Sequence, residues 1–159
     1  MRLSIHAVGR MKSGPARELL DLYSDRCAKA GRQLGIRDFS VREYPESRAV
    51  SVAERKRSEA QAMLTGRGDA QLVAFDENGE DVSSSEFAAI LRGALDGGMP
   101  ELAFAIGGPD GHGQDLLERA DRSLRLGHLT WPHQLVRVMA AEQIYRAITI
   151  LSGHPYHRE

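Results

Sequence analysis

Several features that mark other protein classes are missing from this chain of 159 residues. Its single cysteine, Cys27, excludes an internal disulfide framework and a cysteine-based zinc cage. No apolar run approaches the roughly 20 residues that a membrane-spanning helix needs. Residues 1–6 carry one charged side chain and then alternate apolar and polar residues, which is typical of a strand rather than a signal peptide. We therefore expect one soluble, cytoplasmic domain over residues 1–159, without a membrane segment.

An excess of charge of one sign is also missing. The chain has 21 basic and 22 acidic residues and a net charge of −1. Because phosphate neutralisation supplies most of the affinity of a free-standing nucleic-acid binder, this balance argues mildly against RNA binding. The last third nevertheless contains arginine and no lysine, and arginine is preferred where a planar fork holds a phosphate or a base carbonyl. Ordinary solvated charge explains the composition equally well. The arginines are Arg119, Arg122, Arg125, Arg137, Arg146 and Arg158.

Apolar periodicity alternates between strand and helix along the whole chain. Strands are expected near 1–8, 36–44, 71–76, 101–106 and 123–126, and helices near 15–31, 51–64, 83–96, 114–120 and 134–151. A turn is expected at 77–80. This alternation predicts an α/β domain with a mostly parallel sheet and helices on both faces. Ligands of such sheets bind beyond the carboxyl ends of the strands, here after Val8, Asp76, Ile106 and Leu126.

Two loops at these positions are candidates for ligand binding. The loop 106–113 is rich in glycine, which lets a ligand approach the backbone closely. A dinucleotide fold would carry its glycine fingerprint after the first strand, and Pro109 removes a backbone donor, so a phosphate nest is not expected. A neutral cofactor face such as an adenosine fits this loop, and a tight turn is the alternative. The loop 126–133 mixes apolar side chains with a glycine.

The tail, 153–159, is unusual for a chain end because it holds two histidines, a tyrosine and an arginine. These side chains offer the stacking, hydrogen bonding and phosphate contact that a flipped base requires; a disordered terminus is the alternative. Five histidines fall late in the chain, but no H-E-x-x-H pair or cysteine companion accompanies them, so no metal site is expected. The run Arg55-Lys56-Arg57 is typical of a solvated helix face, with RNA contact as the less frequent alternative.

Four segments together resemble one family. IGGPDG (106–111), LTWPHQLVR (129–137), AEQIYRA (141–147) and HPYH (154–157) are similar to the signatures of the bacterial ribosomal RNA large subunit methyltransferase H family, in the SPOUT class of knotted methyltransferases. The resemblance covers the whole length, with less specific motifs in the N-terminal half. It implies a SPOUT-type α/β knot with a C-terminal trefoil knot, although chain knots are generally rare. It also implies a homodimer with composite active sites.

The resemblance further implies S-adenosylmethionine as methyl donor, and N3 of a pseudouridine in a 23S rRNA stem-loop as acceptor, with no metal. Relatives often carry leucine at the position of Phe75, leucine or methionine at that of Trp131, and a serine-rich stretch at 125–128. By position, the implied cofactor contacts are Phe75, Gly107, Gly108, Gly127, His128, Leu129, Thr130, Trp131 and Pro132.

Methyl transfer to a uracil-type N3 requires loss of its proton, whose pKa is about 9–10, close to that of a phenol. A base that takes the proton and a cation that stabilises the anion would both help. Candidates for the base or its positioning are His133, Tyr156 and His157. Candidates for holding base carbonyls or phosphates are Arg137, Arg146 and Arg158. Two other classes stay open: a catalytically silent ribosome-binding protein of the same fold, and another nucleotide-using α/β enzyme.

Overall fold

The computed structural model describes residues 1–157, which fold as five strands and five helices with one 3-10 turn. The strands form one all-parallel sheet in the order β2-β1-β4-β3-β5, so the predicted α/β architecture is confirmed. The elements are β1 (Arg2–Val8), α1 (Pro15–Ala30), η1 (Gly31–Leu34), β2 (Asp38–Tyr44), α2 (Val52–Arg67), β3 (Gln71–Glu80), α3 (Ser84–Asp96), β4 (Glu101–Ile106), α4 (Gln114–Arg119), β5 (Arg122–Leu124) and α5 (His133–Leu151).

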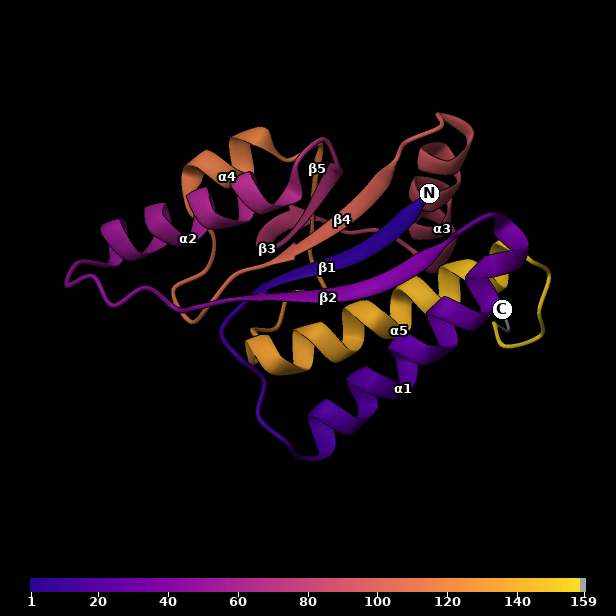
Figure 1. The fold of residues 1–159 in the computed structure, drawn as a ribbon, viewed down its shortest axis with the longest axis horizontal. Coiled ribbons are helices and arrows are strands. Elements are labelled where there is room, and N and C mark those ends of the chain that lie inside the picture. Colours follow the sequence, from indigo (N-terminus) through magenta and orange to yellow (C-terminus); the bar gives the residue numbers. More distant parts are fainter. Residues whose placement is uncertain (158–159) are drawn as a thin grey trace.

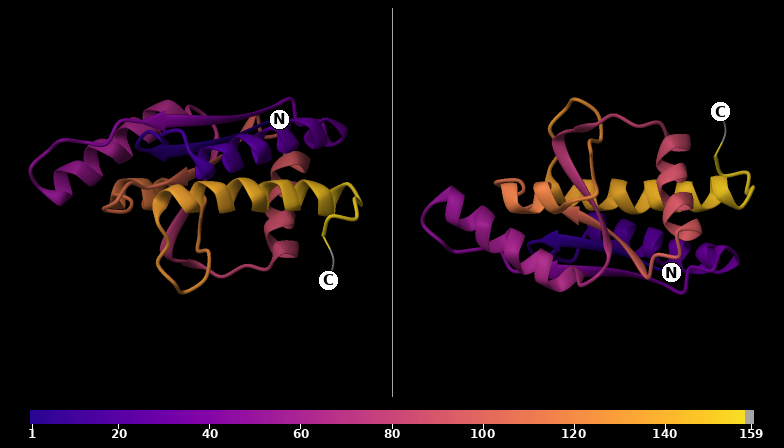
Figure 2. Two further views of the ribbon diagram at one scale, coloured as in Figure 1. Left: turned by 90° about the horizontal axis from the view of Figure 1, so that it is seen from below. Right: turned by 90° about the horizontal axis from the view of Figure 1, so that it is seen from above.

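Helices cover the two faces of the sheet in unequal numbers. Helices α1 and α5 pack side by side, α3 contacts α5 on the same side, and α2 packs with α4 on the other (Figures 1 and 2). The alternation of β1 matches this division, because Leu3, Ile5 and Ala7 enter the larger apolar core and Val8 enters the smaller one. None of the helices within residues 1–157 has the length and apolarity needed to cross a membrane.

Local signals set the helix starts, as the sequence predicts. Pro15 stands at the first position of α1, where a missing N–H costs nothing. Ser51 caps α2 by accepting a hydrogen bond from the backbone N–H of Glu54 at 3.1 Å. Ser83 and Glu86 form a complete capping box at α3. These caps define where the helices begin, and the packed apolar faces define where they lie.

The expected turn at 77–80 is wrong, because β3 continues as a strand to Glu80. After a shift in register, Glu80 pairs with Leu124 of β5. Gly79 makes this approach possible, since a Cβ there would lie 2.7 Å from the Cα of Leu124. The second half of β3 therefore positions the chain where it leaves β5.

Candidate functional site

A cleft of about 490 Å³ lies beyond the carboxyl ends of β4 and β5 and beside residues 75–78 of β3, where the alternation of strands and helices predicts a ligand site. The loop after β4 forms one wall, and the loop between β5 and α5 forms the other. Of the nine residues expected to contact a cofactor, His128 and Pro132 do not line the cleft. The seven that do are Phe75, Gly107, Gly108, Gly127, Leu129, Thr130 and Trp131.

The first wall is a tight turn held from outside by an ion pair. The Gly111 N–H donates to the Gly108 carbonyl at 3.0 Å, and a Cβ on Gly107 would lie 2.8 Å from the carbonyl carbon of Gly111. Asp110 accepts two hydrogen bonds from Arg55 of α2, at 2.7 Å from Nε and 3.2 Å from Nη2. These bonds hold the pKa of Asp110 below its ordinary value. The turn is thus held by a backbone hydrogen bond within the loop and by an ion pair with α2.

The second wall has a similar brace. Arg125 Nε donates to Asp81 at 2.8 Å, its Nη2 makes a second contact with the same carboxylate, and the pKa of Asp81 is lowered as a result. The His128 ring also faces Asp81, with Nε2 at 3.3 Å from the carboxylate, so it points to the brace and away from the cleft. Trp131 Nε1 donates to the Leu126 carbonyl at 2.9 Å, which folds the loop onto itself.

Two histidines line the cleft with the pKa of each lowered. His133, the first residue of α5, has a lowered pKa because of burial and the nearby Arg137 guanidinium. It is therefore neutral at pH 7 and can accept a proton. Burial lowers the pKa of His112, whose Nε2 lies 3.3 Å from the Ala105 carbonyl. Within residues 1–157, His112 Nδ1 has no hydrogen-bond partner. The sequence did not single out His112 as a cleft residue.

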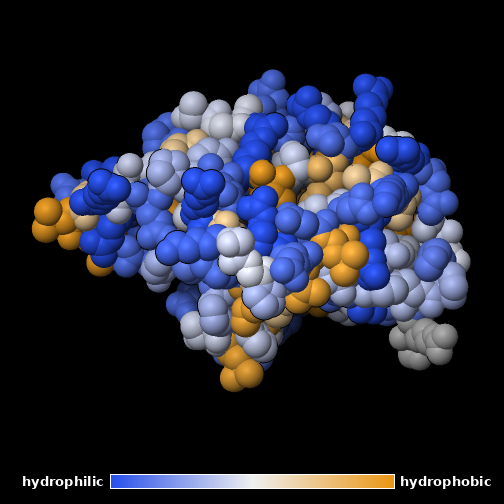
Figure 3. Space-filling view, turned by 60° about the horizontal axis from the view of Figure 1, so that its bottom comes forward, coloured by the Kyte–Doolittle hydropathy of each residue, from blue (hydrophilic) through white to orange (hydrophobic). Residues whose placement is uncertain are grey.

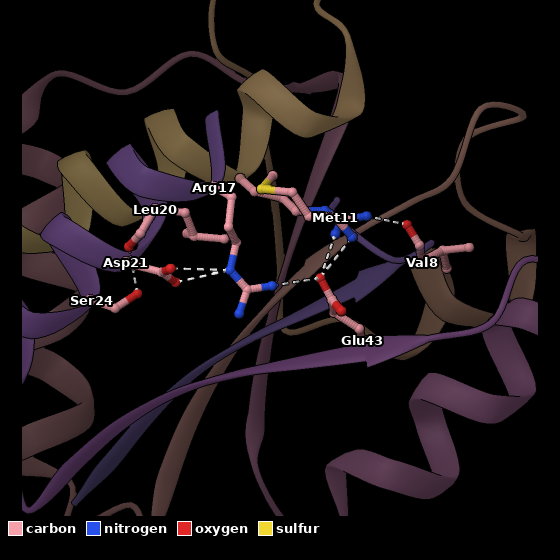
Figure 4. Close-up of polar contacts among 8 residues, drawn as sticks. Val8, Met11, Arg17, Leu20, Asp21, Ser24 and Glu43 are labelled. Carbon is pink, nitrogen blue, oxygen red and sulfur yellow. Dashed lines mark hydrogen bonds and ion pairs between the residues drawn. The ribbon is translucent and has the colours of Figure 1, made fainter. Parts of the chain in front are cut away.

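Arg137 requires a correction, because its side chain is fully buried. Its guanidinium donates to the Val8 carbonyl at the end of β1 and lies 3.3 Å from the carboxylate of Glu43 on β2. Glu43 also accepts from the Met11 N–H at 2.9 Å and lies 3.8 Å from Arg17 (Figure 4). A buried guanidinium cannot touch an RNA base in this conformation. Arg137 instead fixes the start of α5, and with it His133, against the sheet.

The tail candidates gather at the other end of α5. The phenol of Tyr156 donates to Glu142 at 3.0 Å, its ring packs edge-on against Tyr145 at 4.8 Å, and Arg146 lies over it at 5.1 Å. Burial, with Glu142 beside it, raises the pKa of Tyr156, so the phenol stays protonated at neutral pH. Arg146 also pairs with Glu142 at 2.6 Å and reaches His157 Nδ1 at 3.5 Å. Arg158 lies outside the described residues.

One protomer does not bring the cleft and the tail cluster together. His133 and Arg146 stand 13 positions apart on the single helix α5, which separates their backbones by roughly 20 Å. Among residues 1–157, no three His, Cys, Asp or Glu side chains are grouped as a metal site would require. The candidate site residues therefore fall into two separate regions of the described chain.

An all-parallel sheet with a loop-walled cleft at its carboxyl edge defines an α/β protein with a candidate small-molecule site beyond its strands. A sequence model described as predicted SPOUT methyltransferase matches residues 1–157. The chain belongs to the SPOUT methyltransferase family, as its signature segments predict.

Similar proteins support this assignment over the full length. The chain is 53% identical to "Ribosomal RNA large subunit methyltransferase H" of Chelativorans sp. (strain BNC1), covering 100% of this chain and 92% of that protein. It is 52% identical to the protein of the same name from Brucella abortus (strain S19), covering 99% of each. A probable methyltransferase from Bordetella pertussis Tohama I shares the fold with a TM-score of 0.52 at 11% identity, over 92% of this chain and 95% of that one.

The sequence did not predict the two ion pairs that hold the walls of the cleft, Arg55–Asp110 and Arg125–Asp81. Arg55 and Asp110 are 55 positions apart, and Asp81 and Arg125 are 44 apart, so no local pattern links the members of either pair. Lys56 lines the cleft although its charge run is typical of a solvated helix face. The available signal was the position of Asp110 inside a glycine loop, where its carboxylate can accept hydrogen bonds from a cationic side chain of another element.

Proposed function

We propose that the protein is a cytoplasmic methyltransferase that uses S-adenosylmethionine to methylate N3 of a pseudouridine in 23S rRNA. Family membership and the names of relatives more than 50% identical support methyl transfer to large-subunit rRNA. The observation that carries the proposal is the glycine-walled cleft with neutral His133 at its rim. The C-terminal trefoil knot stays a prediction of the family resemblance.

The cleft suits a largely uncharged nucleoside better than a phosphate. Gly107 and Gly127 would present backbone groups to the adenosine, while Phe75, stacked on Phe87 and Phe104, provides an apolar floor. Leu129 and Trp131 are exposed and would close over the ligand. When bound, S-adenosylmethionine supplies an electrophilic methyl group on a sulfonium. The residues of this chain then have to orient the acceptor and remove its proton.

The pKa directions at the site support the following division of the proton-transfer roles. N3 would bond to the methyl carbon once it has lost its proton, and S-adenosylmethionine, when bound, would supply that methyl group and a neutral thioether as the leaving group. His133 is neutral and accepts the N3 proton. Tyr156 remains protonated and acts as a hydrogen-bond donor, whereas Arg146 balances the negative charge on the base. His157 and Arg158 complete the RNA-facing tail.

A homodimer would unite the two separated regions, with the tail of one protomer completing the cleft of its partner. The roughly 20 Å between His133 and Arg146 supports this arrangement. Apolar side chains also remain partly exposed on the paired helices α1 and α5, at Leu19, Leu22 and Leu135. Hydrophobic surface is visible among hydrophilic side chains on the face drawn in Figure 3. Such a patch is the expected signature of a self-complementary interface.

Subunit complementation tests the composite site. His133→Ala disables the cleft and Arg146→Ala disables the tail, so each variant alone should be inactive. After the two are mixed and allowed to exchange subunits, half of the dimers are mixed and each mixed dimer contains one intact site. Activity should then recover to about a quarter of the wild-type value. Mass spectrometry of the methylated nucleotide identifies the product. No recovery would place the complete site within one protomer, and no methylated pseudouridine would reject the acceptor.

A further inference from the structure

The connection between β2 and α2, together with the first turns of α2, projects from the body of the protein. We call residues 45–57 the arm. The arm forms the tip farthest from α3 and the chain termini (Figure 1), and apolar surface is visible at that tip (Figure 3). Val50 is 96% exposed and Val52 is 50% exposed. Exposed valines at the tip of a projecting segment, away from the α1 and α5 patch, call for an explanation other than the dimer.

The arm is exposed but tightly held. Arg55 Nη1 donates to the Ala49 carbonyl at 3.2 Å and to the Val50 carbonyl at 3.0 Å. The Ser47 N–H donates to the carboxylate of Glu59 at 2.8 Å, and Glu59 is itself buried. These bonds hold the backbone of residues 47–50, which leads into the valine tip. A preorganised tip loses little conformational entropy on docking, which is the property of a recognition element.

The same arginine joins the arm to the cleft. The Nε and Nη2 atoms of Arg55 bind Asp110 in the glycine turn, while its Nη1 holds the tip. Lys56, the next residue, lines the cleft directly. The arm and the wall of the cleft are therefore joined through the side chain of Arg55. A macromolecule whose reactive base enters the cleft would extend over the arm.

Charge identifies the chemistry of the partner. Residues 45–57 contain four basic and two acidic residues, in a chain whose net charge is −1. Arg48 and Arg57 are exposed and form no ion pair with any of residues 1–157. Arginines beside an apolar tip match nucleic acid, where guanidinium groups bind phosphates and a small apolar side chain packs on sugar or base surface.

We propose that the arm is an RNA-docking surface, in which Arg48 and Arg57 bind phosphates next to the target nucleotide and Val50 packs against the ribose or base surface. This inference rests on the proposed function, because the arm would contact the part of the rRNA substrate that lies outside the cleft. The arm thereby determines which RNA segment can present a base to His133.

The test compares Arg48→Gln/Arg57→Gln with a control that removes the same charge elsewhere. Arg32→Gln/Arg37→Gln is suitable, because both arginines are exposed near the opposite end of β2. The arm variant should raise KM for large subunits about tenfold or more and lower the salt dependence of RNA binding by about one unit per lost phosphate contact. Calorimetric affinity for S-adenosylmethionine and kcat should stay unchanged. A KM equal to that of the control would overturn the proposal.

A photo-crosslinking residue at position 50 identifies what the tip touches on assembled subunits. Crosslinks to 23S rRNA support the proposal, whereas crosslinks only to a ribosomal protein, or none, overturn it. Failure of the proposed function is separable, because a wild type that binds RNA without transferring a methyl group would reject catalysis. The binding comparison between the arm variant and its control would still decide the role of the arm.

Discussion

Replacing Arg137 by methionine isolates the contribution of one buried guanidinium. The side chain is fully buried, donates to the Val8 carbonyl and pairs with Glu43. Methionine keeps most of the apolar stem and removes the charge and all five donors. The Val8 carbonyl then loses its side-chain donor, while Glu43 stays partly solvated at 24% exposure. The loss of stability should therefore come from the unsatisfied Val8 carbonyl and the lost charged hydrogen bonds. The Glu43 carboxylate should contribute little, because it remains in contact with water.

The expected loss of unfolding free energy is about 3 kcal/mol, since hydrogen bonds involving a charged group contribute about 1.5–3 kcal/mol and an unsatisfied buried acceptor costs about 1–3 kcal/mol. For a domain of this size, that corresponds to a fall in Tm of roughly 6–12 °C. Arg17→Met is the matched control, because Arg17 pairs with the same Glu43 at 3.8 Å but is 42% exposed (Figure 4). Its loss should stay below about 1 kcal/mol.

Urea unfolding of both variants measures the difference through the transition midpoint at constant m value. NMR titration of His133 provides a second readout, because the Arg137 charge lowers the pKa of that histidine. The pKa should rise in Arg137→Met and change little in Arg17→Met. Equal stability losses in the two variants, or an unchanged His133 titration, would refute the positioning role assigned to Arg137.

Two further predictions concern stability. Gly79→Ala should lower the unfolding free energy by about 1–3 kcal/mol, because its Cβ would press on the Leu124 backbone. Gly93→Ala lies in a helix with open space among the described residues, so it should instead raise the unfolding free energy by up to about 1 kcal/mol. Urea unfolding measures both changes. Burial lowers the pKa of His6 and of His112 from 6.5, so the unfolded chain alone takes up these protons as the pH falls below 6.5. Unfolding free energy should be constant above that pH and decline below it, by at most about 1.4 kcal/mol per pH unit for each histidine; equal urea midpoints at pH 7.5 and 5.5 would contradict this.

Local patterns were sufficient to predict most of the fold. Capping residues such as Ser83 with Glu86, and the apolar run 101–106, act over a few positions and can be read directly from the chain. The error at 77–80 has a different origin. An Asn-Gly pair between charged residues is typical of a turn, but here the glycine is needed because another strand passes against it. Only the position of Leu124, 45 residues further on, distinguishes the two cases.

The candidate site shows the same division between local and long-range information. Glycines and the family signatures located both walls of the cleft, and seven of the nine expected cofactor residues line it. Sequence alone could not show that Arg137 faces the core while His128 turns to Asp81. Both outcomes depend on partners from distant parts of the chain, namely Val8 and Glu43 for Arg137 and Asp81 for His128. A charged residue in a functional segment can serve the geometry of the site as readily as its chemistry, and burial is what separates the two roles.

The near-neutral charge of the chain is compatible with an RNA substrate if only a few of its side chains bind phosphates. If Arg48 and Arg57 are the principal phosphate contacts of each arm, the salt dependence of binding should correspond to about two phosphates per protomer, far below that of a strongly basic binder. Affinity would then have to come from shape, through a rigid tip and a composite site that fit one folded surface. Such an enzyme should methylate assembled large subunits much faster than protein-free 23S rRNA. Equal rates on the two substrates would mean that local RNA sequence, rather than assembled shape, directs the enzyme.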